Sequence, residues 1–132
     1  MQIGLISVKP EYVEKILNGS KKVELKKFPL KKGVKNVLVY ATRPTKKIVC
    51  ILHIEEVIED TSENLWSKFG NISGVNKKEF FEYFKGCKKS FAFKIKDAEK
   101  FPEPIDPYKI FPDFRAPETI TYKINEYLSK KL

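Results

Sequence analysis

A short segment near the start of the chain gathers charged side chains at spacings that could form one chemical site. Lys21, Glu24 and Lys26 follow closely after an Asn-Gly pair at positions 18 and 19. A glutamate beside two lysines favours their protonated form, and the lysines in turn keep the carboxylate ionised. Such a set could hold a polar or anionic ligand. An edge strand that lysines merely protect from aggregation would show the same spacing.

The elements on either side of this segment must decide whether the three side chains meet. Residues 2–8 alternate as a strand, and Pro10 suits the first turn of a following helix. That helix carries an apolar stripe, Tyr12, Val13, Ile16 and Leu17, and Gly19 is typical of its C-cap. Residues 20–27 alternate as the next strand. Strict alternation places Lys21 opposite Glu24, so a bulge or bend near Ser20 is needed to bring both into one cleft.

The remaining pattern predicts three more strands and three more helices. We expect strands at 37–42, 46–59 (bent or bulged) and 88–96, with helices starting at 61–62 and after Asn76. A proline-rich stretch covers 101–117, and a final helix is expected over 118–132. This order predicts an α+β fold, a small mixed β-barrel of about five to six strands with short helices. An open βαβ sheet is less favoured, because only one crossover helix lies between two strands.

The charge is distributed unevenly along the chain. Of 132 residues, 26 are Lys or Arg and 17 are Asp or Glu, which gives a formal charge of +9. The first 50 residues hold 12 of the basic and three of the acidic ones, so 12 − 3 accounts for the whole +9. A basic N-terminal segment favours a polyanionic partner such as nucleic acid, since lysines neutralise phosphates. A lysine-rich surface that serves only solubility is the alternative.

Several classes of protein are disfavoured by what the sequence lacks. The length suits a single domain over 1–132, and the apolar runs are too short to span a membrane. We see no secretory signal and expect a cytoplasmic protein. No phosphate-binding loop or dinucleotide fingerprint is present, and we expect no cofactor. Cys50, Cys87 and a single histidine, His53, cannot make a zinc site alone, so no metal is expected. His53 lies mid-strand and is expected to be structural.

The motif from Gly19 to Lys26 resembles a known family. Gly19-x-Lys21-x-x-Glu24-x-Lys26 is similar to the G-x-K-x-x-E-x-R signature of ASCH domains, the activating-signal-cointegrator-1 homology family. The sequence from Ser7 to Pro10, the Val39–Thr42 segment with its following Pro44, and the ending from Phe111 to Pro117 also resemble that family. Lys26 stands where the family has arginine, and lysine lacks the planar fork that grips a phosphate or base edge at two points.

This resemblance implies a PUA-like barrel with a basic cleft that binds RNA or a modified nucleoside. Related modules bind RNA, and single-stranded RNA suits such a cleft because its bases are unstacked. We expect lysines and an arginine to contact phosphates, Glu24 to accept a hydrogen bond from a base or ribose, and Tyr40 to stack on a base. The expected ligand-binding residues are Ser7, Lys9, Gly19, Lys21, Glu24, Lys26, Lys27, Tyr40, Thr42, Arg43 and Arg115.

Two enzymatic alternatives stay open. Some small bacterial ASCH proteins are amidohydrolases that deacylate N4-acetylcytidine, and others have been described as ribonucleases. In an enzyme, Lys21 and Glu24 would be the catalytic pair, with Lys21 as base or nucleophile. The amidohydrolases have threonine where this chain has Glu24, and a neighbouring carboxylate would keep Lys21 protonated.

Overall fold

A computed structural model describes residues 2–126 of the chain. Its elements are, in order, β1 (Ile3–Val8), α1 (Pro10–Leu17), β2 (Val23–Lys26), β3 (Asn36–Ala41), β4 (Lys47–Asp60), α2 (Ser62–Phe69), a 3-10 turn η1 (Gly70–Ile72), α3 (Lys77–Tyr83), β5 (Ser90–Ile105), α4 (Pro107–Ile110) and β6 (Ile120–Thr121). None of the helices in the described part of the chain is long and apolar enough to cross a membrane.

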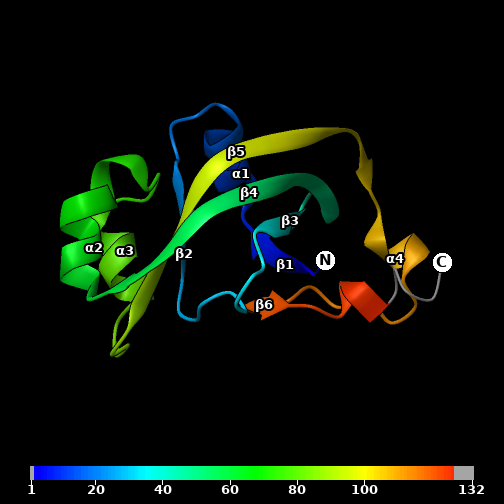
Figure 1. The fold of residues 1–132 in the computed structure, drawn as a ribbon. Helices are drawn as coiled ribbons and strands as arrows, with labels where there is room; N and C mark the ends of the chain where they lie inside the picture. The colour runs from blue at the N-terminus through cyan, green and yellow to red at the C-terminus, as the bar shows by residue number, and fades with distance from the viewer. Residues whose placement is uncertain (1, 127–132) are drawn as a thin grey trace.

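Six strands form one curled sheet in the order β2-β5-β4-β3-β1-β6 (Figure 1). Only β1 and β3 run parallel, and the helix α1 lies on the connection between them. All other neighbours are antiparallel. The strands and short helices confirm the expected α+β class. The sheet is a curled half-barrel whose edge strands are β2 and β6, and α2 and α3 lie together at its β2 end (Figure 1).

Three apolar clusters hold these elements together. The largest joins the inward side chains of β1, β3, β4 and β5 to the apolar stripe of α1, where Val13 and Ile16 are buried. A second packs Val23 and Leu25 of β2 against Phe80 of α3. The odd-numbered residues of β2 thus pack against the α2–α3 region and hold the strand in place. Its even-numbered residues, Glu24 and Lys26, are left to face the other way.

The segment before β2 differs from the expected strand over 20–27. The strand begins only at Val23. The backbone N–H of Lys21 donates to the carbonyl of Lys15 in α1 at 2.9 Å, and that of Lys22 donates to Ile72 at 2.8 Å. These bonds hold Lys21 and Lys22 between helix and strand, so strict alternation does not apply to Lys21. The bend expected near Ser20 is therefore the route by which Lys21 reaches the side of Glu24.

The C-terminal third corrects two expectations. The strand expected over 88–96 continues along β4 as far as Ile105, into the proline-rich stretch. The pairing of β5 with β2 ends at Lys94, so beyond it β5 has no strand on its β2 side. Pro102 and Pro104 are tolerated there because no backbone N–H has to donate a hydrogen bond on that side. The helix expected from 118 begins only at Ile124, because Ile120 and Thr121 pair with β1 as β6. The rest of that expectation, residues 127–132, lies outside the described residues.

Candidate functional site

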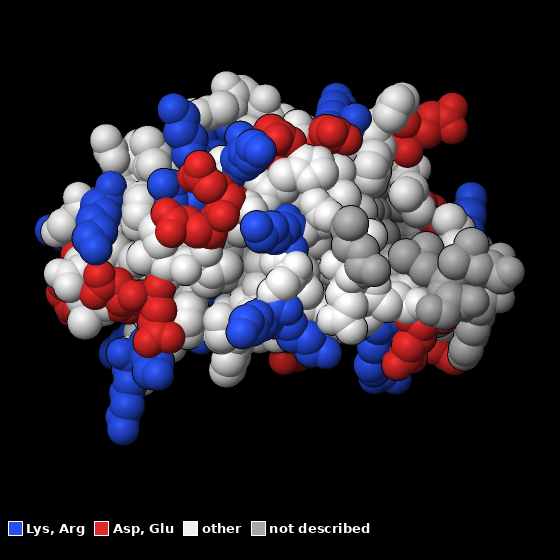
Figure 2. Space-filling model, in the orientation of Figure 1, with Lys and Arg blue, Asp and Glu red and all other residues white. Residues whose placement is uncertain are grey.

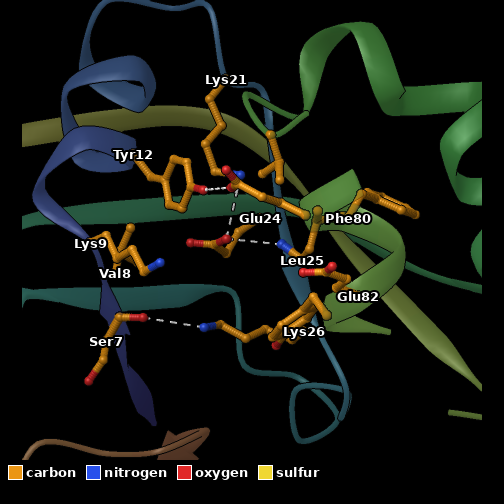
Figure 3. Close-up of a pocket in the computed structure, with 13 residues that line it drawn as sticks. Ser7, Val8, Lys9, Tyr12, Lys21, Glu24, Leu25, Lys26, Phe80 and Glu82 are labelled. Atoms are coloured by element: carbon orange, nitrogen blue, oxygen red, sulfur yellow. Dashed lines mark hydrogen bonds and ion pairs between the residues drawn. The ribbon is translucent and has the colours of Figure 1, made fainter. Parts of the chain in front are cut away.

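A cavity of about 470 Å³ lies where β1 and the start of α1 face β2 and α3. Its lining comes from three segments of the chain, residues 7–12, 21–26 and 75–83 (Figure 3). The lining residues are Ser7, Val8, Lys9, Tyr12, Lys21, Glu24, Leu25, Lys26, Val75, Glu79, Phe80, Glu82 and Tyr83. Three of them are buried charged side chains, Lys21, Glu24 and Lys26.

Lys21 is the most deeply buried of these charges, with 2% of its surface exposed. Its Nζ donates to the carbonyl oxygen of Ser73 and lies 3.6 Å from Glu24 Oε1. The same ammonium stands 5.4 Å from the centre of the Tyr12 ring, a cation–π contact. Gly74 lies so close to the lysine stem that an added Cβ would be 2.9 Å from Lys21 Cβ. The loop of Ser73 and Gly74 therefore forms a close-fitting cradle for this side chain.

Burial and the neighbouring carboxylate shift the pKa of Lys21 in opposite directions, as either effect alone would lead one to expect. Loss of solvent lowers the pKa of the Lys21 ammonium below its ordinary 10.5, and nearby Lys26 adds to the lowering. Glu24 opposes this shift but does not outweigh the burial. The neighbouring carboxylate thus favours the protonated form, as the spacing in the sequence indicates, and burial opposes it more strongly.

Glu24 has one oxygen engaged and one oxygen left over. Its Oε1 accepts from the backbone N–H of Leu25 at 3.0 Å and faces Lys21. Its Oε2 is fully buried and has no hydrogen-bond partner among the described residues. Figure 3 shows the carboxylate extending into the cavity, with this second oxygen on the side of Lys9. A buried acceptor without a donor is costly, so this oxygen marks where a donor on a ligand would be stabilised.

Lys26 spans the opening between the two strands. Its Nζ donates to the backbone carbonyl of Ser7 on β1 at 3.3 Å (Figure 3). The hydroxyl of Ser7 turns away and donates to the carbonyl of Pro117 at 2.8 Å. Ser7 thus lines the cavity through its backbone. One bond from Lys26 leaves two further N–H donors on its ammonium for a ligand.

Two tyrosines and two acidic residues form the rim. The hydroxyl of Tyr12 donates to Glu79, and burial, aided by this carboxylate, raises the pKa of Tyr12, so the hydroxyl stays protonated. Tyr83 is partly exposed and carries the ammonium of Lys27 at 4.9 Å from its ring centre. Lys9, Lys21 and Lys26 are matched by Glu24, Glu79 and Glu82 in the lining. The cavity is therefore of mixed charge.

The molecular surface shows the same mixture. On the face drawn in Figure 2, blue basic and red acidic side chains are interspersed, and the excess of lysine does not gather into one continuous patch. Electrostatic attraction for a polyanion is weaker when carboxylates lie among the lysines. A ligand of this site must therefore supply more than negative charge.

The structure brings together five of the eleven expected ligand-binding residues, namely Ser7, Lys9, Lys21, Glu24 and Lys26. Gly19 has a φ of +86° at the exposed end of α1 and positions the chain rather than lining the cavity. Lys27 does not line the cavity, and its ammonium lies over the ring of Tyr83, a lining residue. The other four, Tyr40, Thr42, Arg43 and Arg115, do not line it either.

Tyr40 lies on the far side of the sheet from this cavity. It is buried, its hydroxyl shares a hydrogen bond of 2.8 Å with that of Tyr108, and its ring packs against Phe114. Its alternating position on β3 directs it to the outer cluster. Arg43 precedes a cis-proline at the end of the same strand, and Arg115 lines a different cavity of about 440 Å³. Tyr40 is thus not available to stack on a base in the cavity of Glu24.

Several residues of the site, Tyr12 and Glu82 among them, were not identified from the sequence. Ser73, Gly74, Glu79 and Tyr83 all come from the α2–α3 region, more than 45 residues beyond Lys21. Their only local signal was Asn76, correctly expected to cap α3, whose side chain accepts from the N–H of Glu79 at 2.9 Å. Local patterns do not reveal which distant loop will cover a cavity. Within residues 2–126, the one cluster of three possible metal ligands lies elsewhere, on β4 and β5.

Known proteins match this chain over most or nearly all of its length. Residues 4–112 match DUF365, described as a domain of unknown function. An "ASCH domain-containing ribonuclease" of Zymomonas mobilis is 30% identical over 130 residues, 96% of this chain and 88% of that protein. A crystal structure of ASCH from Zymomonas mobilis superposes with a TM-score of 0.86 at 28% identity, covering 98% of this chain and 93% of the other.

A third relative is much longer than this chain. The large ribosomal subunit protein uL22 of Ureaplasma parvum is 34% identical over 104 residues, which are 77% of this chain. The matched region is 33% of the Ureaplasma protein. The Ureaplasma protein is thus about three times as long as the segment that matches.

The close fit of Gly74 against Lys21 leads to a prediction. Gly74→Ala should lower the free energy of unfolding by about 1–2 kcal/mol for its left-handed backbone, and by about 1–3 kcal/mol more for crowding the lysine stem. Gly86→Ala is the matched control, because Gly86 has a similar φ of +80° but no atom within 4 Å of an added Cβ. Urea unfolding of both variants gives the comparison. Equal losses would contradict the cradle.

The lowered pKa of Lys21 predicts a dependence of stability on pH. Between the lowered pKa and the ordinary 10.5, the unfolded chain binds more protons at this lysine than the folded chain does. The free energy of unfolding of the native protein should therefore rise with pH relative to Lys21→Met. Urea unfolding from pH 8 to 10 measures the difference, with the exposed Lys22→Met as control. A difference that stays constant, or moves the other way, would contradict the burial effect.

Proposed function

Because the chain belongs to the DUF365 family and is an ASCH domain protein, we propose that it binds RNA by taking a nucleobase into the cavity that Lys21, Glu24 and Lys26 line. The family and the PUA-like fold expected from the motif are confirmed by these relatives. RNA as the ligand is supported by the relative in Zymomonas that is named a ribonuclease.

The observation that carries the proposal is the unpartnered buried oxygen of Glu24. Among the described residues, Oε2 has no donor, while Lys21 and Leu25 hold Oε1 in place. An amino or imino N–H of a base would supply the missing donor, and the free N–H groups of Lys26 would meet a neighbouring carbonyl or ring nitrogen. Nucleobases such as cytosine and adenine present a donor beside an acceptor in this way.

The size and walls of the cavity suit one base. A volume of about 470 Å³ is within the usual range for small-ligand sites. Tyr12 and Tyr83 provide ring faces at the rim, and stacking on an aromatic side chain contributes about 1–3 kcal/mol per base. These rings take the role that the sequence analysis gave to Tyr40. A flipped or single-stranded base can enter the cavity, whereas a base inside a duplex cannot.

Phosphate contacts belong outside the cavity in this proposal. The lining holds as many glutamates as lysines, so the interior offers little net attraction to a phosphate. The exposed lysines at its entrance, Lys9 and Lys27, are suited to the sugar-phosphate backbone. Affinity for an oligonucleotide should then fall with salt. Affinity for an uncharged nucleoside should depend on salt only weakly.

Replacing Glu24 tests the proposal. Glu24→Gln keeps the shape of the side chain but removes a charge-assisted hydrogen bond, whose loss costs about 1.5–3 kcal/mol. We expect affinity for cytidine, adenosine and short single-stranded RNA, measured by calorimetry at low salt, to fall about tenfold or more. Glu63→Gln on the exposed part of α2 is the control and should bind like the native protein.

Two outcomes would count against nucleobase binding at this site. The first is a native protein that binds neither RNA nor any of these nucleosides at low salt. The second is a Glu24→Gln protein that binds RNA as tightly as the native one, which would move the interface to another surface.

Ribonuclease activity is the second candidate, and two observations favour it. The relative from Zymomonas is named a ribonuclease, and burial lowers the pKa of Lys21 toward the range in which an amine acts as a base. In this version Lys21 would accept the proton of a ribose hydroxyl. The same amine would serve hydrolysis of N4-acetylcytidine, the other enzymatic alternative.

A double variant separates binding from catalysis. If the cavity is catalytic, Lys21→Ala with Glu24→Ala should reduce cleavage of an end-labelled single-stranded RNA about 100-fold or more. The same preparation is then incubated with N4-acetylcytidine, followed by chromatography. Cleavage that survives unchanged in the double variant would place the activity outside this cavity.

A further inference from the structure

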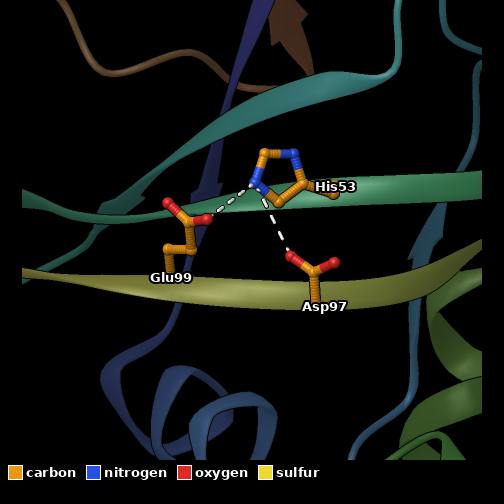
Figure 4. A group of neighbouring side chains, drawn as sticks. All are labelled: His53, Asp97 and Glu99. Atoms are coloured by element: carbon orange, nitrogen blue, oxygen red, sulfur yellow. Dashed lines mark ion pairs between the residues drawn. The ribbon is translucent and has the colours of Figure 1, made fainter.

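We propose that His53, Asp97 and Glu99 form a binding site for a divalent transition-metal ion, with Zn²⁺ as the ion to test first. The three side chains lie on the outer face of the sheet, on the neighbouring strands β4 and β5 (Figure 4). This site is separate from the cavity of Glu24 and does not depend on the proposed function. No metal was expected from the sequence, because the two cysteines and the single histidine cannot form a zinc site alone.

Strand register brings the three ligands together. His53 pairs with Asp97 across the β4–β5 ladder, and Glu99 lies two residues further along β5, hence on the same face. The ladder shifts register directly after His53, and such bulges commonly re-aim a side chain. On its other side His53 pairs with Asn36 of β3. Three adjacent strands thus present an orienting amide, an imidazole and two carboxylates.

The distances fit a metal better than they fit a hydrogen bond. Nε2 of His53 lies 3.6 Å from Asp97 Oδ1 and 3.5 Å from Glu99 Oε1. Hydrogen bonds between nitrogen and oxygen are commonly 2.7–3.2 Å, so a proton alone would leave both contacts long. Tetrahedral Zn²⁺, with bonds of about 2.0–2.2 Å, separates its ligand atoms by roughly 3.3–3.6 Å. The three ligand atoms all lie within 4.8 Å of one another.

The hydrogen bond on the far side of the imidazole also suits a metal ligand. Nδ1 of His53 lies 2.7 Å from Asn36 Oδ1, which can only accept, so Nδ1 carries a proton. In the neutral ring Nε2 then carries a lone pair, and this nitrogen faces two carboxylate oxygens. Three acceptors that converge repel one another unless a second proton or a metal ion lies between them. An orienting hydrogen bond on the far ring nitrogen is also the usual second-shell contact of a metal-bound histidine.

The surroundings leave room for further ligands. A cavity of about 640 Å³ opens over the cluster, so a water molecule can complete the coordination. Lys35 and Lys96 line the same cavity, but within the described residues neither carboxylate is paired with a lysine. Two carboxylates neutralise the charge of a divalent ion. One nitrogen and two oxygens on rigid strands suit Zn²⁺ and related transition metals.

Nuclear magnetic resonance of the full chain tests the site, because His53 is the only histidine. We expect its imidazole resonances to shift on addition of ZnCl₂ at pH 7 and to saturate at one ion per chain. Asp97→Asn and Glu99→Gln keep the reporting ring and should each weaken Zn²⁺ binding at least tenfold. Glu56→Gln, an exposed glutamate of β4 that contacts Lys94, is the matched control and should bind Zn²⁺ unchanged.

Two results would contradict Zn²⁺ binding at this cluster. Imidazole resonances that respond to pH but not to Zn²⁺ would show that the cluster holds a proton and no metal. Equal Zn²⁺ affinity of the native protein and both carboxylate variants would place the ion elsewhere. This experiment does not measure nucleoside binding, so neither result bears on nucleobase binding in the cavity of Glu24.

Discussion

The burial of the Lys21 ammonium is the constraint on which the site depends. Removing a charge from water is costly, and the cost is offset only by well-placed partners. Here the partners are the carbonyl of Ser73, the carboxylate of Glu24 and the ring of Tyr12. They come from a loop, a strand and a helix. Since each must be in place at once, the contact fixes the α2–α3 region against α1 and β2, and so shapes the cavity.

The curled sheet explains why a cavity forms at this point. The strands β1 and β2 are not neighbours in the sheet, and β2 is its edge. Lys26 bridges them from β2 to the carbonyl of Ser7, and apolar packing of Val23 and Leu25 holds β2 from behind. The charged residues of β2 therefore face a space that side chains only partly fill. Glu24 lines that space, and its unpartnered oxygen is buried there.

Local patterns in the sequence predicted the parts of the fold that local chemistry determines. Helix α1, with Pro10 at its start, and the cap of α3 at Asn76 are found as expected. The motif around Glu24 led to the family. Tyr40 was misplaced because its face depends on the pairing of β3, and Ser73 was missed because only the tertiary fold brings it to Lys21. The pKa of Lys21 likewise depends on a depth of burial that spacing does not reveal.

The most direct measurement is a crystal structure of the protein with a short single-stranded RNA that contains cytosine and adenine. Our account predicts one base inside the cavity, with an N–H group within hydrogen-bond distance of Glu24 Oε2 and a ring stacked on Tyr12 or Tyr83. RNA bound at another surface, with Glu24 facing only water, would contradict it.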